Sequence, residues 1–305
     1  MNGVLIIDKP AGLTSHDVVN RVRRILDERS VGHLGTLDPM ATGVLPLVTG
    51  NFTRLAQFYV RCEKVYEGAI RFGFSTDTFD AEGDPTSAPK HVALQRDQLE
   101  FLAAKFRGVI TQTPPPFSAK KIKGVPAYKL ARKQKEVVLQ PVQVEIKEFE
   151  ILSCGADRAS FHARVASGTY MRSVAHDMGQ LLSCGAHLES LRRITVAEFT
   201  LADAHTLDEL AAAAGNCEIP QAPKLDAFFI HPRKLLPNFP SVTADEPAAA
   251  RIRTGRPVNL PELSRARQVK VFTGQRDLIA IASRVAGTLF HPKIVLCRMD
   301  VPIGR

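Results

Sequence analysis

Residues 32–43 read Gly-His-Leu-Gly-Thr-Leu-Asp-Pro-Met-Ala-Thr-Gly and lead directly into the apolar run Val-Leu-Pro-Leu-Val at 44–48. Glycine allows positive φ and close approach of the backbone to a ligand, and Pro39 stiffens the chain after the acid, Asp38. This loop, joined to a strand, is suited to holding one carboxylate in a fixed pose. The alternative is an ordinary Asp-Pro turn, and spacing alone favours it.

Five further blocks of sequence lie around this loop. Taken with residues 32–43, they resemble the TruB family, the pseudouridine synthases that act on position 55 of tRNA. The resemblance covers most of residues 3–210, and so many matches in family order are not expected by chance. The blocks are Asp8–Ser15, Lys64–Tyr66, Ser118–Lys120, Gly168–Arg172 and Cys184–Arg193.

The length and composition indicate a globular protein. At 305 residues the chain is long enough for two domains, and its hydrophobic content of 45% supports a large core. It has no apolar run near the length of a membrane span, and its first residues lack the pattern of a signal peptide. We therefore expect a soluble, cytoplasmic protein that does not contact a membrane.

The five cysteines are far apart and odd in number, and none forms a Cys-x-x-Cys pair. This spacing argues against both a disulfide framework and a zinc site. The reaction that the resemblance implies needs no redox step and no group carrier. We therefore expect no cofactor and no metal.

Positive charge is concentrated in two parts of the chain. The formal net charge is +9; residues 101–135 hold nine Lys/Arg and no acid, and residues 241–305 hold eleven Lys/Arg against five acids. Short charge runs are usually solvated faces. Two basic zones on an otherwise acidic body instead favour a polyanion partner, bound with release of counterions. By the resemblance, that partner is tRNA, contacted at its T-arm and elbow.

The hydrophobic pattern predicts an α+β fold. Thr14 with Asp17 resembles a capping box at the start of an amphipathic helix, and residues 64–73 alternate as in a half-buried strand. Thr206 with Glu209 opens a second capped helix. Further strands are predicted near 3–8, 44–48, 144–153 and 158–167, and further helices over 95–107 and from about 170 to Gly185.

Residues 111–140 differ from the rest of the chain. Three prolines (114–116) precede a basic segment with Phe117 and Tyr128, and too little apolar surface is present for a separate core. We predict a protruding arm that binds RNA phosphates. Its candidate cations are Lys120, Lys121, Lys123, Lys129 and Arg132. Family members often have glycine where this chain has Gln134, which leaves the local backbone conformation of the arm open.

The end of the chain predicts a second domain. Five prolines between Pro220 and Pro240 suggest a linker, and about sixty final residues alternate as short strands. This pattern resembles the PUA-type RNA-binding domain that usually closes the family's chains. The predicted organisation is a catalytic domain at 1–232, with a central mixed sheet flanked by helices, and a small PUA-like β-barrel at 233–305.

The resemblance assigns catalysis to Asp38, Tyr66 and Arg172. Pseudouridine formation breaks the N1–C1′ bond of an extruded uridine, turns the base and joins C5 to C1′. An ionised carboxylate near the sugar is needed, and Asp38 is the acid in the rigid turn. The sequence leaves open whether it adds to C1′ or promotes loss of the C2′ proton to give a glycal.

Arg172 and Tyr66 each have a plainer interpretation. Arg172 falls in the first turn of a predicted helix, where a cation opposes the helix dipole and a nearby anion would offset that cost. Without the resemblance, Arg172 would be an exposed arginine at a helix start, and Tyr66 a core residue of a strand. The resemblance implies instead that Arg172 pairs with Asp38. It also implies that Tyr66 stacks on the uracil and takes part in proton transfer.

Five further residues are expected to bind the substrate. The resemblance implies that Leu191 forms an apolar wall against the base and that His33 helps to open the RNA loop. By pattern alone, Leu191 is a buried leucine and His33 a structural histidine. Extruding a stacked nucleotide costs a few kcal/mol, which stacking and phosphate contacts offset. Lys9, Lys64 and Tyr170 lie in the matched blocks, and Lys9 is expected to brace the pocket floor.

Three functions remain open from the sequence. The favoured one is a monomeric, stand-alone isomerase of a T-loop uridine in tRNA, which needs no protein partner and which a tRNA-folding activity can accompany. The second is a guide-RNA-dependent synthase subunit, which the short N-terminus and the polar segment 76–84 disfavour. The third is a tRNA chaperone without chemistry. The basic zones support this third function, but it does not require Asp38, Tyr66 and Arg172.

Overall fold

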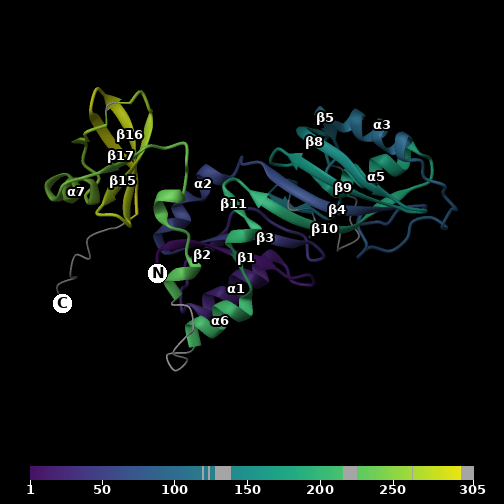
Figure 1. Cartoon of the computed structure of the whole chain (residues 1–305), viewed down its shortest axis with the longest axis horizontal. Helices are drawn as coiled ribbons and strands as arrows, with labels where there is room; N and C mark the ends of the chain where they lie inside the picture. The colour runs from purple at the N-terminus through teal and green to yellow at the C-terminus, as the bar shows by residue number, and fades with distance from the viewer. Residues whose placement is uncertain (119, 123, 128–138, 216–224, 263, 297–305) are drawn as a thin grey trace.

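The structure, a computed structural model of the chain, describes residues 1–118, 120–122, 124–127, 139–215, 225–262 and 264–296. One large sheet and the helices packed on it form most of the molecule, and a smaller sheet lies at one end (Figure 1). This arrangement confirms the predicted α+β class.

The large sheet draws its strands from both ends of the predicted catalytic domain. They are β1 (Gly3–Lys9), β2 (Val31–His33), β3 (Thr42–Thr49), β4 (Lys64–Phe72), β5 (Gly108–Gln112), β8 (Val142–Cys154), β9 (Arg158–Val165), β10 (Ala186–Val196), β11 (Phe199–Thr200) and β12 (Ala204–His205). The order is β12-β1-β3-β10-β4-β9-β8-β5, with β2 paired to β3 and β11 to β10. The pairs β1–β12 and β3–β10 are parallel and the rest are antiparallel, so the sheet is mixed.

Four helices bury their apolar faces in one hydrophobic cluster with the sheet. They are α1 (Ser15–Ile25), α3 (Arg96–Phe106), α5 (Met171–Leu181) and α6 (Leu207–Gly215). The two predicted capping boxes are present. Oγ1 of Thr14 accepts from the amide of Asp17 at 3.0 Å, and Oγ1 of Thr206 accepts from that of Glu209 at 3.1 Å. Each cap satisfies an amide that the first helical turn leaves unpaired.

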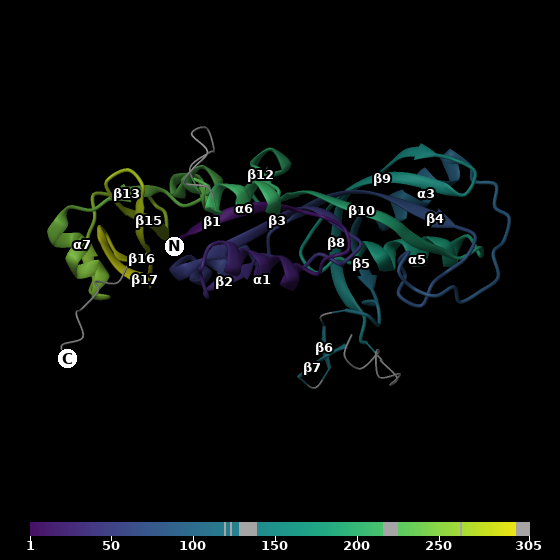
Figure 2. The same ribbon diagram turned by 90° about the horizontal axis from the view of Figure 1, so that it is seen from below.

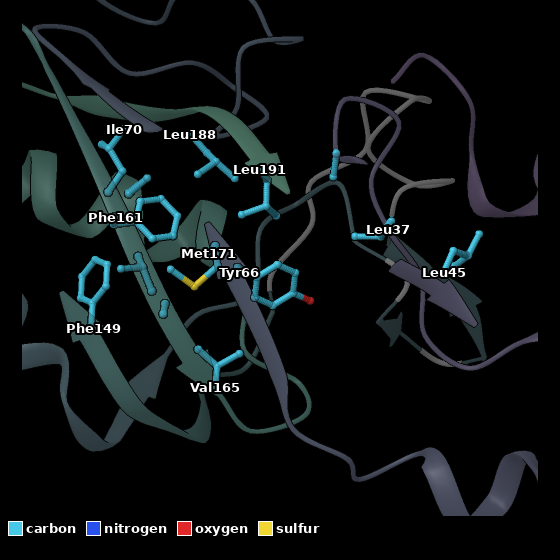
Figure 3. Close-up of a cluster of buried hydrophobic side chains, with 14 of the residues drawn as sticks. Leu37, Leu45, Tyr66, Ile70, Phe149, Phe161, Val165, Met171, Leu188 and Leu191 are labelled. Carbon is cyan, nitrogen blue, oxygen red and sulfur yellow. The ribbon is translucent and has the colours of Figure 1, made fainter. Parts of the chain in front are cut away.

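The alternating pattern of β4 explains where its side chains lie. Tyr66, Ile70 and Phe72 are buried on one face, where they join the cluster under α5. Figure 3 shows Ile70 close to Phe161 of β9, and Tyr66 between these residues and Leu37. Each large apolar side chain buried in this way contributes about 1.5–3 kcal/mol to folding. The cluster therefore fixes the strands that carry Tyr66 and the residues around it.

The C-terminal sheet is curled and has five strands in the order β13-β15-β16-β17-β14. Its elements are β13 (Ser241–Thr243), α7 (Glu246–Arg253), β14 (Val258–Asn259), β15 (Gln268–Thr273), β16 (Asp277–Ala286) and β17 (Leu289–Val295). The PUA-like expectation is confirmed as a half-barrel, in which the described end strands β13 and β14 are not paired with each other. Apolar residues of this sheet, such as Phe272 and Ile281, share a cluster with Val4 and Val48 of the large sheet.

Short helical elements lie in connecting segments of the described chain, and the last two of them join the large sheet to the C-terminal one. They are η1 (Gly50–Leu55), α2 (Ala56–Tyr59), η2 (Leu201–Asp203), η3 (Leu225–Phe228) and η4 (Pro232–Lys234). The described part of the predicted linker is packed rather than free, since Phe228 and Leu235 are buried and Ile230 donates its amide to the carbonyl of Val4 at 2.8 Å. The boundary at residue 232 stays a prediction.

The described part of the predicted arm contains a short hairpin. Strands β6 (Lys121–Ile122) and β7 (Val125–Pro126) pair with each other and project away from the large sheet (Figure 2). The base of the arm is anchored, because Oγ of Ser173 in α5 donates to the carbonyl of Thr113 at 2.8 Å. The arm thus begins beside the helix that carries Arg172.

Among the residues described, no helix is both long and apolar enough to cross a membrane. Within the same residues, no group of three or more His, Cys, Asp or Glu side chains is arranged to hold a metal ion.

Candidate active site

Asp38 and Arg172 are far apart in the sequence but in contact in the structure. Asp38 lies in the Asp38 loop (residues 34–41) between β2 and β3, and Arg172 is in the first turn of α5. Nε of Arg172 lies 2.9 Å from Oδ2 of Asp38, and Nη2 donates to Oδ1 at 3.1 Å. The side chain of Arg172 is 5% exposed and that of Asp38 33%. The interpretation of Arg172 as an exposed arginine at a helix start is therefore wrong.

Other segments fix the rest of the Arg172 guanidinium. Nη1 donates to the carbonyl of Thr78 at 3.2 Å and lies 3.4 Å from Oδ2 of Asp80, while Nη2 donates to the carbonyl of Phe117 at 2.9 Å. A buried cation is tolerated because two carboxylates and two carbonyls surround it. Since the guanidinium is planar and rigid, these contacts also fix its orientation toward Asp38.

The surroundings of Asp38 act on its proton affinity in opposite directions. Burial raises the pKa of Asp38, the guanidinium of Arg172 opposes this effect, and the carboxylate of Asp80 adds to it. The ammonium of Lys9 also opposes it. A guanidinium at contact distance stabilises the ionised form of a carboxylate. The pKa of Asp38 is raised on balance, and Arg172 is the main group that limits this rise.

A fully buried lysine braces the backbone on the C-terminal side of Asp38. Nζ of Lys9 donates to the carbonyls of Pro10 at 2.8 Å, Leu13 at 2.6 Å and Pro39 at 3.1 Å. Burial lowers the pKa of Lys9 to about 8. The structure places Lys9 behind the Asp38 loop, in keeping with the predicted brace rather than with direct contact to substrate.

A second buried cation braces the other side of the loop. The guanidinium of Arg193 donates to the carbonyls of Val44 at 2.8 Å, Thr36 at 3.2 Å and Gly35 at 3.0 Å. Burial lowers the pKa of Arg193. The backbone of Arg193 also explains Gly43, which has φ +100°. A Cβ at Gly43 would lie 2.2 Å from the carbonyl oxygen of Arg193.

A cavity of about 360 Å³ opens beside the Asp38–Arg172 pair. Most of the residues expected to act on the substrate meet there, although they come from four separate parts of the chain. The predicted site residues in its lining are His33, Asp38, Lys64, Tyr66, Tyr170, Arg172 and Leu191.

Tyr66 and Leu191 contribute an aromatic and an apolar surface to this cavity. They come from the paired strands β4 and β10, and their exposed fractions are 7% and 8%. In Figure 3 the hydroxyl of Tyr66 points away from Phe161 and toward the side where Leu37 lies. A planar ligand in the cavity therefore meets both a ring and an aliphatic wall.

His33 and Lys64 line the same cavity with lowered proton affinity. Nδ1 of His33 accepts from the amide of Gly35 at 3.3 Å, and burial lowers the pKa of His33. The ring is thus neutral at pH 7 and carries its proton on Nε2. Nζ of Lys64 donates to the carbonyl of Cys62 at 2.8 Å, and burial lowers the pKa of Lys64 to about 8.

The side-chain amide of Gln112 holds Tyr170 at the start of α5. Oε1 of Gln112 accepts from the amide of Tyr170 at 2.8 Å, and Nε2 donates to the carbonyl of Tyr170 at 3.1 Å. Burial raises the pKa of Tyr170. This pairing ties the base of the arm to the helix that carries Arg172.

A second cavity, of about 570 Å³, lies against the same pair. It shares His33, Asp38 and Arg172 with the first cavity and adds the acids Asp80 and Glu82. Asp38 therefore lies where two cavities meet.

The structure also reveals site residues that were not predicted. Asp80 lies in the polar segment 76–84, and Arg193 ends the last matched block; neither pattern predicts a place in the site. A dense group of acids within 76–84, in a basic protein, was the available signal for Asp80. Of the predicted arm cations, Lys120 is exposed, and no side chain is described for Lys121. Lys123, Lys129 and Arg132 lie outside the described residues.

Sequence comparisons show which family the chain belongs to. The family model described as TruB family pseudouridylate synthase (N terminal domain) matches residues 23–171, and the tRNA pseudouridylate synthase B C-terminal domain matches residues 172–230. The chain belongs to the TruB family. It is 50% identical over 300 residues to tRNA pseudouridine synthase B of Solibacter usitatus, covering 97% of this chain and 100% of that protein. The Aquifex aeolicus protein of the same name is 45% identical over 215 residues, covering 70% of this chain and 75% of that one.

Comparison with solved structures gives the fold of this TruB family member. The chain superposes with a TM-score of 0.72 on a chain of an H/ACA RNP bound to a substrate RNA containing 2′-deoxyuridine, at 23% identity, covering 98% of this chain and 86% of that one. A chain of a Cbf5-Nop10-Gar1 complex gives 0.71 at 24% identity, with the same coverage. These similarities confirm the predicted pseudouridine-synthase fold.

Proposed function

We propose that this protein is a tRNA pseudouridine synthase that isomerises a uridine in the T-loop, at position 55. The observation that carries the proposal is the Asp38–Arg172 contact at the meeting point of two cavities. RNA binding alone does not require a carboxylate that is held by a buried arginine and exposed to a cavity. Isomerisation does require such a carboxylate, because the reaction takes place at the sugar of the uridine.

The reaction requires the uridine to leave its stack and enter the cavity beside Asp38. Extrusion costs a few kcal/mol, which contacts to base and backbone repay. Tyr66 stacks on the uracil and Leu191 closes the opposite side, so the freed base stays in place. His33 and Tyr170 line the entrance and contact the neighbouring nucleotides.

Asp38 acts on the sugar as an ionised carboxylate, whether it adds to C1′ or promotes loss of the C2′ proton. In either case the N1–C1′ bond breaks, the uracil turns, and C5 bonds to C1′. The proton on C5 is then removed while N1 gains one, so no atom is lost overall. Tyr66 is the group placed near the base for that proton transfer, and Arg172 keeps Asp38 ionised and oriented.

RNA binding rests on the basic zones. Lys120, Lys121, Lys123, Lys129 and Arg132 of the arm contact phosphates of the T-arm and elbow. A crevice of about 380 Å³ beside the C-terminal sheet adds a second basic surface, lined by Arg54 of η1, Arg253 of α7 and Lys293 of β17. Each phosphate neutralised releases counterions, so affinity falls steeply as salt rises. The enzyme works as a monomer in the cytoplasm, without a protein partner or cofactor.

Incubation of the pure protein with an unmodified tRNA transcript tests the proposal. Chemical labelling for pseudouridine followed by mass spectrometry should find one modified site, in the T-loop. A bare T-arm hairpin should also react, which separates this enzyme from a guide-RNA-dependent subunit. Absence of product on both RNAs would overturn the proposal.

A tRNA-folding activity is a second function that the basic surfaces favour, because they lie on elements other than the Asp38 loop. Asp38→Asn should lose isomerisation but still accelerate refolding of a denatured tRNA. Refolding at the uncatalysed rate would remove this second function.

A further inference from the structure

Phe79 and His176 form a stacked aromatic pair outside the two cavities. Their ring centroids are 3.8 Å apart and the rings are inclined by 16°. Phe79 has φ +64°, in the left-handed region that bulky residues rarely adopt. Such backbone persists only where its surroundings determine it, and it is frequent near functional sites.

Backbone hydrogen bonds attach this turn to the large sheet. The amide of Leu188 in β10 donates to the carbonyl of Phe79 at 3.0 Å, and the amide of Ala81 donates to the carbonyl of Leu188 at 3.0 Å. The amide of Phe79 itself donates to the carbonyl of Thr76 at 3.3 Å. The chain therefore reverses sharply at Phe79, while its flanks stay fixed.

The reversal brings both neighbours of Phe79 to the same guanidinium. The carbonyl of Thr78 accepts from Arg172, and the carboxylate of Asp80 lies 3.4 Å from it. Arg172 and His176 are four residues apart on α5, so they share one face of the helix. The helix therefore contacts segment 78–80 twice, through Arg172 and one turn later through His176.

The ring face of His176, rather than its nitrogens, makes this contact. Nδ1 of His176 is buried and has no hydrogen-bond partner within the described residues. Burial lowers the pKa of His176, so the ring is neutral at pH 7. A neutral ring stacks as an aromatic side chain, and its geometry depends on ring shape.

We propose that the Phe79–His176 stack is a positioning device for the isomerisation, which holds segment 78–80 in its disfavoured turn so that Arg172 stays aligned with Asp38. This inference rests on the proposed function. Phe79 and His176 line neither cavity, so they act through Arg172 rather than on the RNA. Small displacements of a catalytic group are costly to the chemical step.

The test is single-turnover pseudouridine formation on a T-arm hairpin, first with four single variants. His176→Ala and Phe79→Ala should each lower the rate of the chemical step roughly tenfold, with less than about a twofold change in the RNA concentration for half-maximal rate. His176→Phe keeps the ring and should restore the rate to within about twofold. The matched control is Phe101→Ala, which removes an exposed phenylalanine on α3 and should leave the rate unchanged.

Phe79→Gly separates the ring from the backbone conformation. Glycine adopts positive φ without strain, so this variant should fold at least as well as Phe79→Ala and yet remain slow. Full activity in Phe79→Gly or His176→Ala would overturn the proposal. Slow turnover in His176→Phe would also overturn it, because the stack would then not be the cause.

A double-mutant cycle completes the test. Phe79→Ala and His176→Ala combined should be no slower than either alone, whereas two independent defects would multiply. If the rate losses of the two single variants multiply in the double variant, the two rings do not act as one unit and the proposal is contradicted. An inactive wild-type enzyme would instead refute the proposed function, and the thermal unfolding midpoints of the same variants would still report whether the two rings are coupled.

Discussion

The Asp38 loop and segment 78–80 each present an aspartate to the same arginine, but they do so in different ways. The side chain of Asp38 is 33% exposed and that of Asp80 is 4% exposed. Oδ1 of Asp80 already accepts from Oγ1 of Thr78 at 2.5 Å and from the amide of Glu82 at 3.1 Å. The oxygens of Asp38 contact only Arg172 among the described polar groups.

The difference shows how one guanidinium can serve two carboxylates. A carboxylate whose hydrogen-bonding sites are filled and buried holds its neighbours in place. A carboxylate with free lone pairs facing a cavity is available for chemistry. Arg172 joins the two, so the comparison can be tested by removing each charge in turn.

The largest effect is expected for Asp38→Asn. Turnover should fall by at least about 10⁴-fold, because the amide can neither add to the sugar nor accept its proton. The apparent Kd for tRNA, from filter binding, should change by less than about threefold, since the shape is kept. Asp208→Asn, on an exposed position of α6, is the matched control. Turnover near the wild-type rate would remove Asp38 from catalysis.

The next largest effect is expected for Arg172. Arg172→Lys keeps the charge but loses the planar fork, so kcat should fall roughly 100-fold. Arg172→Met removes the group that opposes burial, so the pKa of Asp38 rises. As pH is lowered, the residual activity of Arg172→Met should therefore disappear at a higher pH than wild-type activity does.

A pH–rate profile checks that direction. The Met variant also leaves two carboxylates unpaired and should lose about 3–5 kcal/mol of unfolding free energy, measurable by urea denaturation. An unchanged acid limb would mean that Arg172 does not control the ionisation of Asp38.

Asp80→Asn should lower kcat less than Arg172→Met does, and it should shift the acid limb of the pH–rate profile in the opposite direction. The amide oxygen can still accept from Thr78 and Glu82, so kcat should fall only about tenfold. Because the charge of Asp80 raises the pKa of Asp38, its removal should move the acid limb to lower pH. The pH–rate profiles of Asp80→Asn and Arg172→Met should be measured together. Shifts of the two acid limbs in the same direction would contradict the opposite effects of Asp80 and Arg172 on the pKa of Asp38.

The effect that is smallest at neutral pH concerns Lys64, whose pKa burial lowers to about 8. The free enzyme loses this cation as pH rises through that value, so kcat/KM should decline by about tenfold toward pH 9. Bound phosphate keeps Lys64 charged, so kcat should decline less. Lys64→Met should have a low kcat/KM without the alkaline limb. A limb that persists in this variant would have to come from another group.

Much of the site follows from local sequence. The rigid setting of Asp38 follows from the glycines and Pro39 of its loop, and the capped helices follow from Thr14 and Thr206, because dihedral preferences and caps act within a few residues. Tyr66 was placed on a strand by its periodicity, whereas Leu191 was predicted only to be buried, and its strand β10 was not predicted. The expectation that both residues act in the site came from the family resemblance, not from the hydrophobic periodicity.

Asp80 and Arg193 show why the remainder could not be predicted. Acids in polar segments and arginines in strands are usually exposed, and no local sequence preference shows which of them are buried. Asp80 and Arg193 are buried by groups that are distant in the sequence. Asp80 meets a helix that starts about ninety residues later, and Arg193 donates to carbonyls of the Asp38 loop more than 150 residues earlier.

The sequence by itself determined the class of fold, the turn that carries Asp38, and the basic arm and C-terminal sheet. Only the tertiary structure decided that Arg172 is buried against two carboxylates, that Lys9 and Arg193 brace the loop, and that Phe79 takes a disfavoured turn. The physical reason is the sequence separation over which each interaction acts. Backbone preferences depend on neighbouring residues, whereas a charge can be buried only where groups from distant parts of the chain pair with it.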